Sequence, residues 1–173
     1  MRIEPAAKPN ATELPHWARW LWLAAGVLAA DQATKAAILA SIREGDGWAV
    51  TPFLSLVLTF NTGAAFSFLA TATGWQRWFF AAIAVAAAIL IVVLLRRGGS
   101  PMYNAGLALI LGGALGNLYD RLALGKVVDF LLFHYAQWAW PAFNVADSAI
   151  TVGAALLIVD SFRARRADAR LGP

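Results

Sequence analysis

Two aspartates near the end of the chain stand in apolar sequence without an obvious basic partner in helical register. Asp129 follows two valines in "GKVVDF", and Asp147 lies in "FNVADSAITVG". A carboxylate in apolar surroundings costs free energy unless it is paired or neutralised. Two carboxyls that meet share one proton, so that one takes a proton from water while the other protonates a carbonyl oxygen. This is the chemistry of aspartic peptidases, although spacing along the sequence fixes no distance.

Other hydrolytic chemistries have less support in the sequence. There are no cysteines, and the two histidines, His16 and His134, are far apart. No metal-ligand spacing is present, so we expect neither a thiol nucleophile nor a metal or other cofactor. A serine protease that uses Ser67 or Ser148, with Lys35 as its base, stays an alternative.

The composition is that of an integral membrane protein. The chain has 173 residues, of which 60% are hydrophobic and only 14% charged. Soluble domains are nearer half apolar and a quarter charged. The net charge of +4 comes with no basic stripe interleaved with aromatics, so nucleic acid is not an expected partner. We expect one domain, residues 1–173.

Four apolar runs are long enough to cross a bilayer as helices. They cover residues 17–40, 75–95, 102–122 and 140–162. Basic residues are more numerous in the segments that lie inside when both termini are cytoplasmic, which favours that orientation. Within the third run, "GGALG" at 112–116 indicates close helix packing rather than a ligand site.

Two segments between these runs are predicted to lie on the outer side. Residues 46–70 mix β-branched and aromatic residues with a Thr-Gly turn, which predicts a small sheet or hairpin. Residues 123–139 are too short to span and too apolar for a simple loop, so they predict an interfacial helix or a re-entrant piece. "RRGGSP" at 96–101 predicts a tight inner turn.

The costly polar residues of the predicted spans and outer segments gather near the outer face. Asp147 is expected six residues after Pro141, about 9 Å along a helix. Polar residues at membrane depth are functional candidates. The set comprises Asp31, Lys35, Asn61, Asn117, Asp120, Arg121, Asp129, Asn144, Asp147 and Ser148.

Simpler roles are open for several of these residues. Asp31 and Lys35 are spaced i,i+4, so their simpler role is an ion pair on one face of a helix. Arg121 alone would snorkel to the headgroups. Asn61, taken by itself, would be a turn residue. Asp120 would be a local partner of Arg121 or a helix cap.

Four blocks of the sequence, in order, resemble the motifs of the bacterial lipoprotein signal peptidases, the signal peptidase II family. The match extends over the region of the four predicted spans, roughly residues 17–162. The blocks are "DQATK" at 31–35, "FNTGAAFSFL" at 60–69, "GALGNLYDRLALGKVVDF" at 113–130 and "FNVADSAITVG" at 143–153.

The resemblance implies an aspartic endopeptidase of the bacterial inner membrane. Such an enzyme cuts signal peptides from prolipoproteins just before a diacylglyceryl-modified cysteine. By motif, Asp129 and Asp147 would be the catalytic pair. Asn61, Asn117, Arg121 and Asn144 would hold the substrate backbone and order the site, with Asp31, Lys35 and Asp120 supporting it.

The fold that this resemblance implies is an all-α bundle of four transmembrane helices with a small outer β-cradle and an interfacial helix. The active site would lie near the outer, periplasmic face, and the enzyme would act as a monomer among membrane lipids. A proton-coupled carrier and a purely structural bundle stay as rival readings. The carrier is disfavoured because the sequence shows no internal repeat.

Overall fold

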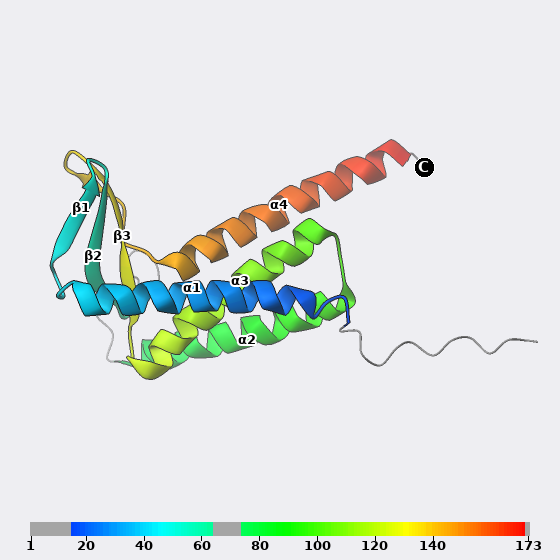
Figure 1. Cartoon of the computed structure of the whole chain (residues 1–173). Coiled ribbons are helices and arrows are strands. Elements are labelled where there is room, and N and C mark those ends of the chain that lie inside the picture. Colours follow the sequence, from blue (N-terminus) through cyan, green and yellow to red (C-terminus); the bar gives the residue numbers. More distant parts are fainter. Residues whose placement is uncertain (1–14, 64–73, 172–173) are drawn as a thin grey trace, which may run out of the picture.

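Over the part of the chain that the structure describes, the protein is a bundle of four helices with a small sheet at one end (Figure 1). The computed structural model describes residues 15–63 and 74–171. The helices are α1 (Arg19–Ser41), α2 (Trp75–Arg97), α3 (Pro101–Ala123) and α4 (Val145–Leu171). The sheet lies beyond the C-terminal ends of α1 and α3 and the N-terminal ends of α2 and α4 (Figure 1).

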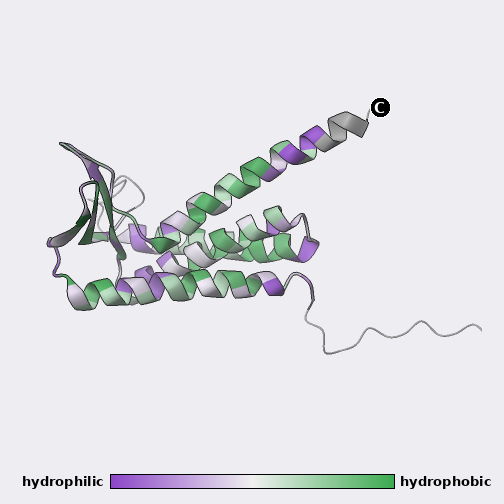
Figure 2. Ribbon diagram, turned by 45° about the horizontal axis from the view of Figure 1, so that its top comes forward, coloured by the Kyte–Doolittle hydropathy of each residue, from purple (hydrophilic) through white to green (hydrophobic). Residues whose placement is uncertain are grey.

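Three of the described helices are long and apolar enough to cross a membrane: α1, α2 and the part of α4 from Val145 to Arg166. Figure 2 shows hydrophobic residues along these helices and hydrophilic ones toward the C-terminal end of α4. α3 has the same length as α1 and α2 but does not reach that hydropathy. It lies among the other helices and contacts all three, so much of its surface faces protein instead of lipid.

Glycines let α3 approach its neighbours closely. A Cβ on Gly112 would lie 2.5 Å from the carbonyl oxygen of Ala24 in α1, and one on Gly113 would meet that of Ala146 in α4. The prediction that the "GGALG" segment serves helix packing is confirmed. The turn predicted at 96–101 is also confirmed, because α2 ends at Arg97 and Ser100 caps α3 by accepting a hydrogen bond from the Tyr103 amide, 3.0 Å.

Among the described residues, the sheet has four antiparallel strands in the order β1-β2-β3-β4. β1 (Gly47–Thr51) and β2 (Leu54–Asn61) fall within the predicted outer β region, whose residues 64–70 lie outside the described part of the chain. The hydrophobic cluster of Ile38, Ile42, Leu58, Val128 and Phe130 joins the C-terminal end of α1 to this sheet.

The prediction of an interfacial helix at 123–139 is wrong. These residues form β3 (Val127–Tyr135) and β4 (Trp138–Ala139). The reason is long-range: β3 pairs with β2 from Leu54↔Phe133 to Asn61↔Val127, which satisfies an edge of β2 that would otherwise stay unpaired. The segment is also rich in valine and aromatic residues, which suit a strand.

The start of the last helix also differs from the prediction. Residues 140–144 are not helical, because the Trp140 amide donates to the Phe133 carbonyl and Phe143 pairs with Leu131 of β3. α4 begins at Val145 instead of near residue 140. Asp147 therefore lies in the first turn of α4, and the expected depth of about 9 Å is an overestimate.

The close crossing of α3 and α4 predicts that Gly113→Ala destabilises the protein. The added Cβ would meet the Ala146 backbone, which cannot move without α4, so we expect a loss of about 1–3 kcal/mol in the free energy of unfolding. Thermal unfolding in detergent micelles would measure it. The matched control is Gly26→Ala in α1, whose Cβ meets nothing within 4 Å and should leave the melting temperature unchanged or slightly raised. Equal melting temperatures for the two variants would contradict this packing.

Candidate active site

Asp129 and Asp147 face one cleft, although they come from different elements. Asp129 lies on β3 and Asp147 on α4. Both line a cavity of about 790 Å³ at the junction of the sheet and the helices, together with Asn61, Asn117 and Arg121. The structure therefore gathers both predicted catalytic aspartates and three of the predicted polar residues around one space.

Asn144 connects the two aspartates. Its side-chain Nδ2 donates to Asp129 Oδ1 at 2.7 Å. Its backbone amide donates to Asp147 Oδ2 at 3.3 Å, and its Oδ1 accepts from the Asp147 amide at 2.9 Å. Asn144 is fully buried, and so is its bond to Asp129, whereas its two bonds to Asp147 are part-buried.

The reciprocal contacts of Asn144 and Asp147 have the form of a capping box at the start of α4. In a capping box, the side chain of the residue before the helix accepts a hydrogen bond from the backbone amide of the third helical residue. The side chain of that third residue in turn accepts from the backbone amide of the capping residue. In "NVAD" these roles fall to Asn144 and Asp147. The pattern of Asn followed three residues later by an acid is readable from the sequence as a helix start. It would have placed the helix start correctly.

Asn117 on α3 holds Asp147 from the other side. Its Nδ2 donates to Asp147 Oδ1 at 2.8 Å. Its Oδ1 accepts from both Lys35 Nζ and Asn144 Nδ2, each at 3.2 Å. Because both neighbours are donors, the Asn117 oxygen must face them, and this fixes the amide nitrogen toward Asp147.

Lys35 is buried in an ion pair with two carboxylates. Its Nζ lies 2.8 Å from Asp31 Oδ2 and 2.9 Å from Asp120 Oδ2, and the three side chains are 2%, 0% and 2% exposed. The ion pair predicted for Asp31 and Lys35 is confirmed. Asp120 on α3 forms its ion pair with Lys35, which lies on α1. The prediction of a local pair between Asp120 and Arg121 did not anticipate this partner.

Each of these carboxylates also holds a segment that carries a site residue. Asp31 Oδ1 accepts from the Ala146 amide at 2.9 Å, next to Asp147. Asp120 Oδ2 accepts from the Val128 amide at 3.0 Å, next to Asp129. The buried ion group thus fixes the backbone beside both aspartates of the cleft.

Arg121 and Asn61 hold the segment at the mouth of the cleft. Arg121 donates to the carbonyl oxygens of Asn117 and Gly63, both at 3.2 Å, so its guanidinium is engaged with the protein and does not merely snorkel. Asn61 Oδ1 accepts from the Gly63 amide at 2.9 Å, which confirms its turn role. Its side chain also hydrogen-bonds to Asp129.

Burial raises the pKa of Asp129 to about 7, and the negative charge of Asp147 acts in the same direction. Hydrogen bonds from Asn61 and Asn144 oppose this rise in pKa. Near neutral pH, Asp129 therefore retains a proton for much of the time. The environment of the cleft favours a carboxyl pair that holds one proton between its two members.

The remaining candidates are placed as follows. Ser148 lines the cleft, but its hydroxyl donates to the Asn144 carbonyl at 2.9 Å, and Ser67 lies outside the described residues. In the part of the chain that the structure describes, no three His, Cys, Asp or Glu side chains gather as a metal site would need.

The buried ion group predicts a large loss of stability in Lys35→Met. The substitution leaves Asp31 and Asp120 as buried carboxylates without a cation, which we expect to cost about 3–5 kcal/mol in the free energy of unfolding. Lys126→Met is the matched control, because the Lys126 ammonium lies over the Phe60 ring and outside the ion group. Unfolding in detergent would measure both variants.

Neutralising the two carboxylates as well tests the cause of that loss. Adding Asp31→Asn and Asp120→Asn to Lys35→Met should recover part of the stability, because no unpaired charge is then buried. A Lys35→Met variant as stable as Lys126→Met would show that the ion group is dispensable.

The raised pKa of Asp129 predicts that stability falls as pH rises. The unfolded carboxyl has its ordinary pKa of 3.8, so between about pH 4 and 7 the folded protein binds more protons than the unfolded one. The contribution of Asp129 to the free energy of unfolding is therefore complete below about pH 4 and is lost as the pH rises through 7. Over this range the free energy of unfolding falls by at most about 1.4 kcal/mol per pH unit. Asp129→Asn should flatten this dependence, since an amide has no proton to lose.

Melting temperatures between pH 4 and 8 would measure this slope. The control is Asp46→Asn, which changes an exposed aspartate at the edge of the sheet and should keep the parental slope. If the melting temperature of Asp129→Asn fell with pH as steeply as that of the parent, Asp129 would not be the group responsible for the pH dependence.

Comparison with known proteins shows the family of this chain. The family model described as "Signal peptidase (SPase) II", of the Peptidase_A8 family, matches residues 23–163. A lipoprotein signal peptidase of Paraburkholderia phytofirmans is 57% identical over 147 residues, which is 84% of this chain and 86% of that protein. One of Burkholderia mallei is 55% identical over 147 residues, covering 84% of this chain and 89% of that protein.

Solved structures of membrane enzymes share the fold. One, described as "Bacterial membrane enzyme structure by the in meso method at 2.3 A resolution", has a TM-score of 0.76 and 31% identity, covering 84% of this chain and 88% of that one. A second, at 1.9 Å, has a TM-score of 0.73 and 32% identity, covering 82% and 91%. The protein is thus a multi-pass membrane protein, and its chain belongs to the signal peptidase II family of aspartic peptidases.

Proposed function

We propose that the protein removes signal peptides from prolipoproteins by cutting before a diacylglyceryl-modified cysteine, with Asp129 and Asp147 as its catalytic pair. Family membership and the activity in the names of the relatives support the reaction. The observation that carries the residue assignment is Asn144, which hydrogen-bonds to both aspartates at the edge of one cleft.

The two aspartates have different surroundings, which favours different roles. Asp147 accepts from Asn117 and from the Asn144 amide, and it lies in the first turn of α4, where the helix dipole favours a negative charge. Asp129 has a pKa raised to about 7 by burial. We assign the ionised carboxylate to Asp147 as general base and the protonated carboxyl to Asp129 as general acid.

In this mechanism Asp147 removes a proton from water while the water oxygen bonds to the scissile carbonyl carbon. Asp129 donates its proton to the carbonyl oxygen, so that the tetrahedral intermediate is neutral at that oxygen. The proton on Asp147 then passes to the leaving amide nitrogen as the C–N bond breaks. Asp129 takes back a proton from a hydroxyl of the intermediate, whose oxygen becomes the carbonyl of the new carboxyl group, so both aspartates return to their starting states. For one water to be shared, the two carboxyls must come within roughly 3–6 Å of each other, which stays a prediction.

The polar neighbours divide into two groups by the bonds they already make. The Asn117 side chain is used by Lys35, Asn144 and Asp147, so we assign it to ordering the site. Arg121 and Asn61 line the cleft and hold its mouth, which suits contacts to the substrate backbone. A peptide unwound at membrane depth needs such partners, because lipid offers none.

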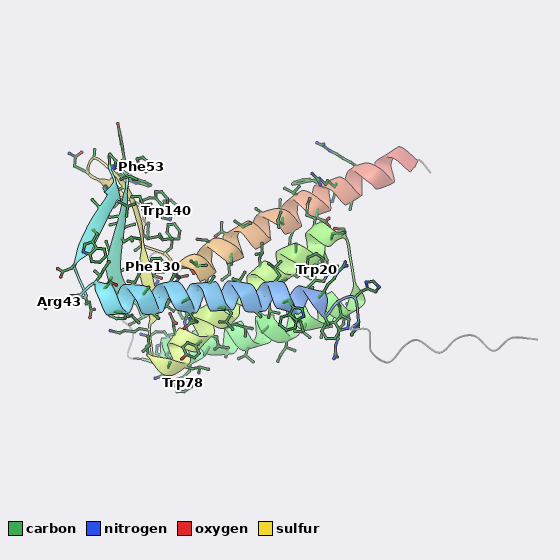
Figure 3. All side chains as sticks on the ribbon, in the orientation of Figure 1. Trp20, Arg43, Phe53, Trp78, Phe130 and Trp140 are labelled. Carbon is green, nitrogen blue, oxygen red and sulfur yellow. The ribbon has the colours of Figure 1, made fainter. Side chains whose placement is uncertain are left out.

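We further propose that the sheet end faces the periplasm and that both termini are cytoplasmic. Arg19, Arg96, Arg97 and Arg163 lie at the opposite end, as the positive-inside tendency requires. In Figure 3, Trp20 marks that end, whereas Trp78 and Trp140 mark the sheet end, as interfacial aromatics do. The active site then lies near the outer face of the inner membrane. We propose that the enzyme acts there as a monomer, in contact with membrane lipids.

The serine and carrier readings have less support. Lys35 bonds to Asp31, Asp120 and Asn117, and Ser148 donates to a backbone carbonyl, so Ser148 and Lys35 do not form the pair that a serine nucleophile needs. Ser67 lies outside the described residues. A carrier would place its polar site near the bilayer midplane, whereas this cleft adjoins the sheet at one end of the bundle.

The proposed mechanism predicts that Asp129→Asn and Asp147→Asn each lose activity by about 10³-fold or more, because neither carboxyl can be both acid and base. The measurement is the cleavage rate of a lipidated precursor by purified enzyme, followed by gel shift. Asp160→Asn is the control: Asp160 accepts a hydrogen bond from Ser100 at the far end of α4 and should leave the rate unchanged. Near-normal turnover by a folded Asp129→Asn or Asp147→Asn enzyme would refute the catalytic assignment.

A further inference from the structure

A second hollow lies beside the active-site cleft, between α1 and α4. It has a volume of about 450 Å³, with Leu109 of α3 at its base. Its α1 side includes Gly26, Val27 and Ala30, and its α4 side includes Val145. Apart from Ser148 and the indole of Trp22, its lining consists of aliphatic side chains and a glycine, so it offers few polar groups for a peptide backbone. We call it the α1–α4 groove.

The α1–α4 groove begins at the depth of the catalytic residues and runs toward the middle of the bundle. At its outer end, Asp31 accepts from the Ala146 amide and holds α1 against the first turn of α4. Beyond that point α4 leans away from α1 toward its C-terminus (Figures 1 and 2). From Val145 to Val152 the groove follows α4 for about 10 Å.

The groove is continuous with the active-site cleft. Ser148 and Val152 line both hollows, and they lie on the strip of α4 that separates them. The Ser148 hydroxyl is already bonded to the Asn144 carbonyl, and Val152 is exposed on the helix surface. An apolar chain that leaves the cleft beside Asp147 therefore reaches the groove without burying an unsatisfied polar group.

We propose that the α1–α4 groove binds one acyl chain of the diacylglyceryl group on the substrate, an inference that rests on the proposed function. The modified cysteine follows the scissile bond directly, so its acyl chains start at the depth of Asp147. The groove starts there too and runs in the direction that an acyl chain takes in a leaflet.

The groove suits the substrate's chain better than a bulk phospholipid. A phospholipid would need space for its headgroup above the outer end. There Val145 packs against the cluster that includes Ile38, Ile42 and Val128. Lipid tails are as apolar as the groove, so moving the acyl chain from lipid into the groove yields little hydrophobic free energy. Binding of the chain instead anchors the substrate, which holds the adjacent peptide bond near the aspartates.

Filling the groove tests this assignment. In Gly26→Leu the new side chain enters open space, because a Cβ at Gly26 meets nothing within 4 Å, so the fold should be retained. The substrates are one precursor with palmitoyl chains and the same precursor with butyryl chains, which are too short to occupy the groove. The control is Ala86→Leu on the exposed surface of α2, outside both hollows.

We expect Gly26→Leu to raise KM for the palmitoyl precursor about tenfold, the loss of roughly one modest binding contact. Its kcat/KM for the butyryl precursor should match that of the parent, and Ala86→Leu should match the parent on both. Parental kinetics of Gly26→Leu on both precursors would overturn the proposal, and so would an equal loss on both. Failure of the parent enzyme to cleave either precursor would instead refute the proposed function.

Photo-crosslinking separates the substrate's chain from bulk lipid. The precursor carries a diazirine near the end of one palmitoyl chain and is bound to the Asp129→Asn enzyme in phospholipid nanodiscs. We expect labelling of the α1 segment around Gly26 and of Leu109, reduced in Gly26→Leu. A diazirine phospholipid that labels the same residues equally with and without excess precursor would show that bulk lipid fills the groove and would overturn the assignment.

Discussion

The arrangement of the active site depends on a single buried ammonium group. A lysine with 2% of its side chain exposed requires compensating charge, and Lys35 obtains it from Asp31 on its own helix and from Asp120 on α3. Both carboxylates also accept from the Gln32 side chain and from backbone amides, those of Ala146 and Val128. One charge cluster thus ties α1 and α3 to the segments that present Asp147 and Asp129. Loss of the cation would affect the backbone on both sides of the cleft.

The same cluster sets the hydrogen bonds that reach the aspartates. Lys35 donates to the Asn117 oxygen, which leaves the Asn117 amide nitrogen to donate to Asp147. Asn144 donates to both Asn117 and Asp129, and it also caps the helix that carries Asp147. Such a network is costly when any member lacks a partner, so it holds one geometry and resists alternatives. Such fixed surroundings suit the proposed catalytic pair of Asp129 and Asp147, which would share one proton.

The position of the site at one end of the bundle suits a substrate that arrives within the bilayer. α3, whose glycines allow close contact with α1 and α4, carries Asn117, Asp120 and Arg121 into the protein interior and keeps them away from lipid. The sheet contributes Asn61 and Asp129 from the opposite side of the cleft. In the proposed function, water would reach the carboxyls from the sheet end, and an apolar substrate would approach along α4. The division between a polar cleft and the adjoining α1–α4 groove follows from the two faces of that single helix.

The sequence by itself determined the class of protein and its chemical groups. Apolar runs marked the helices, β-branched residues marked β1 and β2, and carboxyls in apolar sequence marked Asp129 and Asp147. These signals are local, because each depends on residue type and short spacing. Four ordered motif blocks named the family, and comparison with relatives confirmed it.

Only the tertiary structure decided what depends on partners distant in sequence. Residues 127–135 are a strand because β2 offers an edge far away in the chain, a fact that their own apolar pattern does not contain. α4 begins at Val145 because residues 140–143 bond to β3 first. Asp120 pairs with Lys35 and not with its neighbour Arg121 because the α1–α3 contact brings that ammonium within 2.9 Å. Hydrogen bonds and ion pairs form between groups that folding brings together, and residue spacing along the chain does not specify those distances.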